Sequence, residues 1–535
     1  MNKNTRQNLI IALTYSLTLI GGMFLGYRFL KDQGYSVQKQ VAYVDNNPEK
    51  VDEIIHIINK NYVDDVNADK MNNLPIDSIL HRLDPHSMYL PPAKAYEQTA
   101  ALEGQFEGIG IEYYILNDTL LVTNVVKDGP AYAAGLKLGD KILKVDTTYV
   151  SGRNLPREKM IGKIKGPKGT PVQLVVKHLD NPNPVRLVVR RGKVQVSSID
   201  AAYMLNNETA YIRISKFGAN TDIDFVDAVK NLKGKGMSKL VLDLRDNGGG
   251  YLTAATGLAS QLLPENKLIV YTEGKHEPRT DYLATGGGEF EQGKLAILIN
   301  ENTASASEIL AGAVQDLDRG VIIGRRSFGK GLVQEQFPFG DGSALNLTIA
   351  RYYTPLGRSI QKSYKKGYTA YHNEIDERYT DGELTDDNGH LRDSLKRNTA
   401  FVTSSGKKVY AGGGIQPDIY VKMDTAGISK AYTTLVGKKV LFDYVFDVLA
   451  RRYSASALEQ NLQAFNIGEA DYKDLLRYME KRKIHVDLNQ LSRSKPMIAS
   501  DLKVLLYKFY FGEAGYYKAL NLNDKMVKQA LASLQ

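Results

Sequence analysis

The chain contains no cysteine among its 535 residues. This excludes disulfides, thiolate metal sites, a cysteine nucleophile and a lipid-carrying cysteine near the N-terminus. Histidine is scarce, with 8 residues, and none of them forms a His-Glu-x-x-His motif. The closest pair, His81 and His86, is five positions apart. We therefore expect neither a metal nor another cofactor.

The sequence also lacks a basic stripe. Its net charge of +9 is spread along the chain and interrupted by acidic pairs such as Asp376-Glu377 and Asp386-Asp387. Nucleic-acid-binding surfaces normally cluster Lys and Arg on one face, so we expect no nucleic-acid partner. Hydrophobic residues make up 43% and charged residues 24%, as in ordinary globular proteins, and the length allows several domains.

Residues 9–30, LIIALTYSLTLIGGMFLGYRFL, contain an uncharged run of about the length that spans a bilayer. No Ala-x-Ala cleavage site follows this run, which favours an uncleaved anchor, with a removed signal peptide as the alternative. We expect residues 1–8 to be cytoplasmic, with a single-pass anchor in the cell membrane and residues 31–47 as a linker. The remaining chain would then lie in the periplasm or another extracytoplasmic space.

The rest of the chain divides by pattern into an α/β multi-domain protein. Apolar residues at helical spacing predict a small N-terminal helical module over residues 48–103. Residues 192–424 alternate strands and helices, including TAYIRIS, KLVLDLR, KLIVY, KLAILIN and GVIIG, which predicts an α/β layered core. Within it, the polar stretch near 362–408 is interpreted as a surface insertion. Residues 425–535 are predicted to form a C-terminal helical region.

Short strands dominate residues 104–191, including two around the turn Asn117-Asp118. Their order, with Ala133-Ala134-Gly135-Leu136 and Gly139-Asp140, resembles a PDZ domain. The carboxylate-binding loop of that family corresponds to Gly108-Ile109-Gly110-Ile111. Glycines in such a loop leave backbone amides free to bind a terminal carboxylate, and an adjacent strand edge pairs with an extended peptide. A small β-barrel with an ordinary glycine turn is the alternative.

Two segments at the ends of predicted strands contain small residues beside groups that can take part in catalysis. The first, residues 243–250 (DLRDNGGG), runs from a strand through three glycines into a helix, an arrangement that suits an anion or a developing oxyanion. The second, residues 299–308, places Ser305 at the start of a helix. Ser305 and Glu308 match a capping box, so Ser305 is either a helix cap or a nucleophile at the same sheet edge.

The third segment, residues 321–334 (VIIGRRSFGKGLVQ), contains Gly-x-x-x-x-Gly-Lys. A nucleotide-binding loop would need Ser or Thr after the lysine and a helix beyond it, whereas glycine follows and the pattern predicts a hairpin. A serine nucleophile needs a base, yet His276 lies in a polar loop and His86 lies far off in the helical module. A buried, neutral Lys330 can act instead, with Gln334 on the same face of an extended chain to hold its amino group.

Together with LDPHSMYL, NTASASEILAGAVQD and ARYYTPLGRSIQ, these segments resemble the carboxyl-terminal processing peptidases, or tail-specific proteases. The resemblance covers roughly residues 50–425 and implies a crotonase/ClpP-like protease core with an inserted PDZ domain. It implies that Ser305 attacks a peptide bond, that Lys330 is the base and that Gln334 orients Lys330. Amides of Ala306 and of Gly250 or Gly249 would hold the oxyanion.

The resemblance further implies protein substrates with free C-termini, and helical regions that support a homo-oligomer or bind an adaptor. The main alternative is a PDZ scaffold or adaptor with an inactive protease domain, against which the presence of Ser305, Lys330 and Gln334 argues. A crotonase-like enzyme acting on a thioester is disfavoured by the PDZ segment and by the Ser/Lys pair.

Overall fold

The computed structural model describes residues 50–66, 76–179, 181, 183–387 and 399–535. The predicted anchor at residues 9–30, residues 1–8 and the linker at 31–47 lie outside these ranges. Inside them, no helix combines the length and the apolar character that crossing a bilayer requires.

A six-stranded sheet forms the centre of the core, in the order β10-β11-β12-β15-β16-β21. β10 runs antiparallel to β11, and the other neighbours are parallel. The inner strands match the predicted apolar runs and are almost wholly buried, as expected for parallel strands covered on both faces. The strands are β10 (Ile199–Met204), β11 (Thr209–Ile214), β12 (Lys239–Asp243), β15 (Lys294–Ile299), β16 (Val321–Gly324) and β21 (Ile419–Tyr420).

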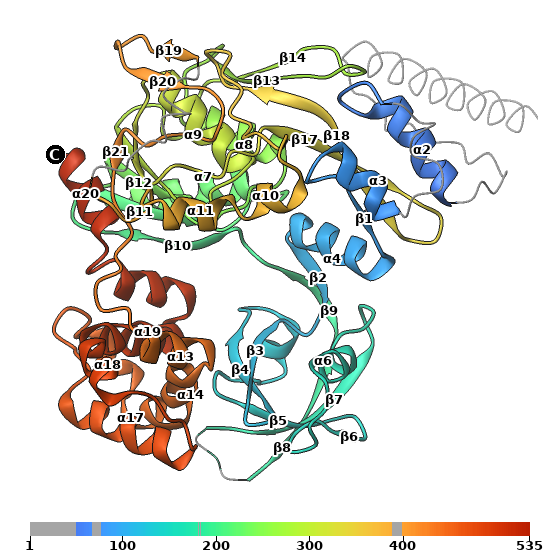
Figure 1. Ribbon diagram of the computed structural model, residues 1–535. Helices are drawn as coiled ribbons and strands as arrows, with labels where there is room; N and C mark the ends of the chain where they lie inside the picture. Colours follow the sequence, from blue (N-terminus) through green and yellow to red (C-terminus); the bar gives the residue numbers. More distant parts are fainter. Residues whose placement is uncertain (1–49, 67–75, 180, 182, 388–398) are drawn as a thin grey trace, which may run out of the picture. The chain divides into compact units, whose positions relative to one another are not determined.

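Helices cover both faces of this sheet (Figure 1). On one face α7 (Thr221–Lys233), α8 (Leu252–Ser260) and α9 (Ala306–Asp316) contribute to the largest apolar cluster. On the other face α20 (Lys525–Ser533) packs its buried residues against the strands. The last helix of the predicted C-terminal helical region therefore completes the core.

A second sheet contains β1 (Met88–Leu90), β13 (Leu268–Glu273), β14 (Thr280–Leu283), β17 (Leu332–Pro338) and β18 (Ala344–Tyr353). β17 and β18 form the predicted hairpin after Lys330, so no helix follows that lysine as a nucleotide-binding loop requires. The run KLIVY, predicted as a strand of the layered core, forms part of β13, which belongs to this second sheet and pairs with β18.

The N-terminal module consists of α2 (Lys50–Asn61), α3 (Ile76–Leu83) and α4 (Pro92–Glu103). Its strand β1 pairs with β18, so the module joins the second sheet directly. The strands β2 (Gln105–Gly108) and β9 (Gly192–Gln195) pair with each other at the two ends of the predicted PDZ segment.

The PDZ segment has its own sheet, in the order β3-β4-β5-β7-β8, and its own apolar core. Asn117 and Asp118 adopt the left-handed conformation that a tight hairpin turn requires, with φ of 47° and 56°. The elements are β3 (Ile111–Leu116), β4 (Thr119–Val125), α5 (Pro130–Ala133), β5 (Lys141–Val145), β6 (Thr148–Tyr149), α6 (Arg157–Ile164), β7 (Pro171–Lys177) and β8 (Val185–Arg190).

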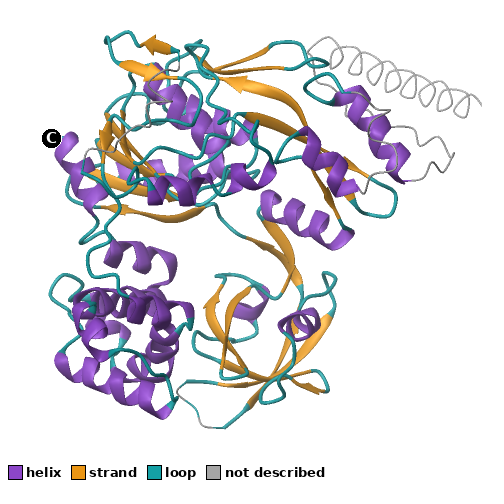
Figure 2. Cartoon of the chain, in the orientation of Figure 1, coloured by secondary structure: helices purple, strands orange, loops and turns teal. Residues whose placement is uncertain are grey.

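Residues 430–520 are mostly helical, as predicted (Figure 2). They share an apolar cluster rich in Tyr, Phe and Leu, which also includes Leu116 and Leu121 of the PDZ segment. The elements are α13 (Lys430–Gly437), α14 (Val440–Tyr444), the π-helical η2 (Val445–Leu449), α15 (Ala450–Arg452), α16 (Ala455–Glu459), α17 (Glu469–Lys481), α18 (Leu488–Arg493) and α19 (Lys495–Leu520).

The segment near 362–408 is not simply a surface insertion. It contains α10 (Tyr368–His372), α11 (Glu374–Thr380) and, after residues outside the described ranges, β19 (Ala400–Val402) and β20 (Lys408–Tyr410). Tyr371, Arg378 and Glu383 are buried. Arg378 and Arg326 both pair with Glu383, which joins this segment to the chain just before Lys330. The surface interpretation is therefore wrong for Tyr371, Arg378, Glu383 and Leu384, which are buried among mostly exposed neighbours.

Candidate active site

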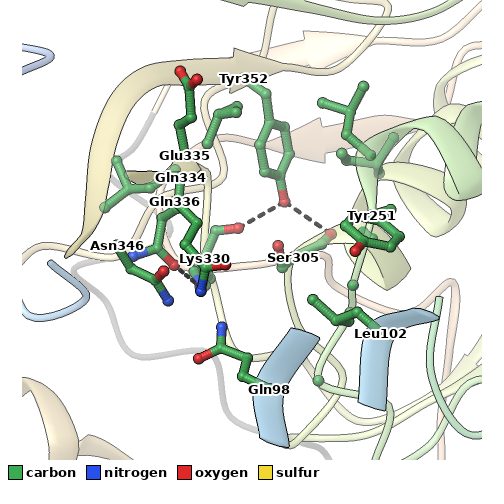
Figure 3. Close-up of a pocket in the computed structure, with 18 of the residues that line it drawn as sticks. Gln98, Leu102, Tyr251, Ser305, Lys330, Gln334, Glu335, Gln336, Asn346 and Tyr352 are labelled. Carbon is green, nitrogen blue, oxygen red and sulfur yellow. Dashed lines mark hydrogen bonds between the residues drawn. The ribbon is translucent and has the colours of Figure 1, made fainter. Parts of the chain in front are cut away.

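The three chemically distinctive segments meet at one edge of the central sheet. They follow β12, β15 and β16, which are adjacent parallel strands, so their carboxyl ends lie side by side. A cleft of about 470 Å³ opens there. Its lining includes Gly248–Gly250, Ser305, Ala306, Lys330 and Gln334, as well as residues of α4 (Figure 3).

Ser305 both caps a helix and lines this cleft. It forms the predicted capping box, in which Glu308 Oε2 accepts the N–H of Ser305 at 2.9 Å. Its backbone has φ 56° and ψ −119°, a conformation that costs free energy in a non-glycine residue and recurs at functional sites. The Tyr352 hydroxyl lies 2.7 Å from the Lys330 carbonyl oxygen and 3.1 Å from that of Ser305, so its one hydrogen is shared between the two backbones (Figure 3).

Lys330 lies in the same cleft and has its predicted partner. Its Nζ donates to Gln334 Oε1 at 2.7 Å (Figure 3). Desolvation by the surrounding protein lowers the pKa of Lys330, although the carboxyl groups of Asp84 and Glu308 act in the opposite direction. A lysine with a lowered pKa is an available proton acceptor. The strand carries a β-bulge between Val333 and Gln334, which simple alternation did not predict.

Glu308 connects the serine segment to the lysine segment. Its buried carboxylate accepts hydrogen bonds from the N–H groups of Ser305, Gly329 and Lys330 at 2.9, 2.7 and 2.8 Å, and from Ser327 Oγ at 2.5 Å. Burial nevertheless raises the pKa of Glu308 to about 7, because desolvation outweighs these donors. The sequence predicted Glu308 only as a capping partner, since its other contacts are 19 or more positions away.

The glycine turn after β12 approaches Ser305 closely. A Cβ on Gly249 would lie 2.8 Å from the Cβ of Ser305, and one on Gly250 would lie 2.0 Å from the carbonyl oxygen of Phe217. Gly249 donates its N–H to Asn247 Oδ1 at 2.9 Å. The N–H of Gly249 is thus engaged inside the turn, although Gly249, Gly250 and Ala306 all line the cleft.

A buried cluster of charged residues lies at the end of β12, directly before the glycine turn. Asp243 is fully buried and accepts hydrogen bonds from Tyr211, Arg213 and Arg245. Desolvation alone would raise the pKa of Asp243, but the two guanidinium groups hold it below its ordinary value. Arg245 also donates to Asp524 at 2.6 Å, so the residue that caps α20 is tied to the turn.

His86 is not remote from the site, contrary to the expectation from sequence. Its backbone carbonyl accepts the Gln334 Nε2 at 2.7 Å. Burial, with lesser effects of Lys330, His372 and Lys362, lowers the pKa of His86 to about 2, so the ring is neutral. His86 and Gln334 are 248 positions apart in the sequence, so no local sequence pattern could predict their contact.

The predicted carboxylate-binding loop lies at the end of the PDZ sheet. Gly108 ends β2 and Ile111 begins β3, with Ile109 and Gly110 in the turn between them. Gly110 has φ 78°, and the carbonyl of Ile109 accepts the N–H of Ala131 at 2.7 Å. Because β3 is the terminal strand of its sheet, its other edge is positioned to pair with an extended peptide.

Comparison with known families agrees with this architecture. Residues 208–369 match the model of peptidase family S41, residues 99–177 match the PDZ domain, and residues 431–512 match a family of unknown function. The chain belongs to peptidase family S41 and is a serine-type peptidase with a PDZ domain.

Similar proteins include a carboxy-terminal-processing protease of Bartonella bacilliformis, 31% identical over 72% of this chain and 87% of that protein. A CtpA-like serine protease of Staphylococcus aureus (strain MRSA252) is 31% identical over 65% of this chain and 68% of that protein. Among solved structures, the photosystem II D1 C-terminal processing protease is 26% identical, covers 70% of this chain and 93% of that chain, and gives a TM-score of 0.38.

Proposed function

We propose that this chain cleaves proteins near their C-termini, with Ser305 as nucleophile, Lys330 as general base and Gln334 as the residue that orients the base. The observation that carries this proposal is the desolvated Lys330, hydrogen bonded to Gln334 in the same cleft as Ser305. A lowered pKa lets a lysine accept a proton near neutral pH.

In this proposal Ser305 Oγ attacks the scissile carbonyl carbon as Lys330 Nζ takes the hydroxyl proton. The N–H groups of Ala306 and Gly250 stabilise the oxyanion. Lys330 then returns the proton to the leaving amine as the C–N bond breaks, which leaves an acyl-enzyme. Water attacks this ester with Lys330 again as base, and Ser305 is regenerated.

The PDZ domain would supply the selection of substrate. Backbone amides around residues 108–111 would bind the terminal carboxylate, and the free edge of β3 would pair with the tail. The test compares two versions of one unstructured substrate, identical except for a free or an amidated C-terminus. We expect the free form to be cleaved at a lower KM. Equal KM values for the two forms would contradict capture by the carboxylate.

We further propose that residues 9–30 anchor the protein in the cell membrane, with the catalytic part in the periplasm or an equivalent space. The uncharged run supports this proposal, while basic residues flank it on both sides, with Lys3 and Arg6 before it and Arg28 and Lys31 after it. The test is fractionation of cells that express the full chain or residues 32–535, followed by protease treatment of intact spheroplasts. Recovery of the full chain in the soluble cytoplasmic fraction would contradict the proposal.

A further inference from the structure

The amide of Gln334 has two different neighbours, and only one orientation satisfies both. Its Oε1 accepts from Lys330 Nζ at 2.7 Å, while its Nε2 donates to the His86 carbonyl at 2.7 Å. A backbone carbonyl can only accept, so it selects the orientation that presents oxygen to Lys330. The N-terminal module thereby determines which end of the amide faces the lysine.

The backbone around His86 is held by its own turn. Asp84 Oδ1 accepts the N–H groups of His86 and Ser87 at 2.8 Å each, and Asp84 Oδ2 accepts Ser87 Oγ at 2.6 Å. Ser87 Oγ in turn accepts the N–H of Thr348 at 3.2 Å. Because Thr348 belongs to β18, which pairs with β17, the turn is tied to the same hairpin that carries Gln334.

The ring of His86 is held separately by Tyr371. His86 Nε2 and the Tyr371 hydroxyl are 2.8 Å apart, and the two rings meet edge to face. Gln361 Nε2 donates to the same hydroxyl at 3.3 Å, while Gln361 Oε1 accepts the N–H of Gly331 at 2.8 Å. These contacts form a ring that runs from Gln334 through His86, Tyr371 and Gln361 to Gly331, the residue after Lys330.

We propose that His86 and Tyr371 are positioning residues for the general base, acting through the His86 carbonyl on Gln334 and through Gln361 on the backbone beside Lys330. This inference rests on the proposed function of Lys330. With the ring of contacts intact, Gln334 Oε1 accepts a hydrogen bond from the Lys330 amine and keeps water away from that amine. Loosening the ring would let water reach Lys330 and raise its pKa.

The test uses Tyr371→Phe and His86→Phe in the full-length protein, because each removes one partner of the same hydrogen bond and keeps an aromatic ring. We expect kcat to fall about tenfold in either variant, with KM within about twofold, on the scale of one lost hydrogen bond in an active site. The double variant should be no worse than Tyr371→Phe alone, because that substitution already removes the shared contact with His86 together with the contact to Gln361.

The matched control is Tyr368→Phe, which removes a hydroxyl from an exposed residue of the same helix α10. It should behave as wild type. The proposal is overturned if Tyr371→Phe and His86→Phe change kcat no more than this control does. The proposal is also overturned if the loss of kcat in the double variant equals the sum, in free energy, of the two single losses. Additive losses would mean that the two residues do not share a contact.

A pH measurement separates positioning from general stability. The titratable groups that face Lys330 are Asp84, Glu308 and His86, and the two Phe variants leave both carboxylates in place. We expect the acid limb of kcat/KM to move to higher pH by about half a unit. The ε-carbon NMR signal of Lys330, assigned with Lys330→Arg, should titrate with the same shift. If the titration of Lys330 does not move in these variants, the positioning role of His86 and Tyr371 is overturned. This measurement does not need cleavage, so absence of cleavage would count separately, against the proposed function.

Discussion

At the scale of single residues, one carboxylate joins the two halves of the site. Glu308 accepts donors from the serine segment and from the lysine segment, so it fixes the spacing between Ser305 and Lys330. That Ser305, Lys330 and Gln334 line one cleft could be predicted from sequence, because each lies in a short motif at a strand end. Glu308 and His86 could not be assigned their roles, because their partners come from distant segments.

Glu308→Gln should disable the enzyme while changing the side-chain volume little. Donors face both oxygens of Glu308, so the NH₂ group of a glutamine would point at N–H or O–H groups wherever it is placed. We expect kcat to fall about 100-fold, as unmet buried donors displace the loop. Kinetics and circular dichroism would check this, and a variant with near-normal kcat would show that the bridge is dispensable.

The pH dependence of cleavage follows from the same two groups. Lys330 must be neutral to accept a proton, and Glu308, with a pKa of about 7, must be ionised to accept N–H donors on both oxygens. Both requirements are met by losing a proton, so kcat/KM should rise as pH rises, with a limb near pH 7. Activity that falls between pH 6 and pH 8 would contradict this assignment.

At the scale of elements, the glycine turn after β12 is determined by close backbone contact. Gly250 has φ 147° and its Cβ position is 2.0 Å from the Phe217 carbonyl, whereas a Cβ on Gly248 meets nothing within 4 Å. Gly250→Ala should lower the free energy of unfolding by about 3 kcal/mol, and Gly248→Ala by much less. Urea denaturation would compare them, and equal stabilities would contradict the steric account.

The inner strands of the central sheet were predictable because both of their faces are apolar, and the β17–β18 hairpin because turn residues separate two strand-like runs. The burial of Arg378 and Glu383 was not, since it depends on the ion pair between them rather than on apolar periodicity. The bulge at Val333 was also unpredictable, because it is a shift in the register between β17 and β18 and depends on how the two strands pair.

At the scale of the whole molecule, the far end of the chain completes the core. Ala530 of α20 is fully buried against the central sheet, and its neighbour Gln529 is exposed. Ala530→Asp should cost roughly 3–5 kcal/mol of unfolding free energy, because it places an unpaired charge under the sheet, while Gln529→Asp should cost little. Thermal unfolding would check this, and similar melting temperatures would contradict the packing of α20.

The Ser-Lys mechanism is tested by cleavage of an unstructured protein with a free apolar C-terminus by residues 32–535, beside the Ser305→Ala and Lys330→Ala variants. We predict cleavage by the wild type and loss of cleavage in both variants, with tail peptides still bound by all three proteins. Cleavage that persists in Ser305→Ala or Lys330→Ala would contradict the Ser-Lys mechanism. Binding without cleavage by the wild type would favour a PDZ scaffold with an inactive protease domain.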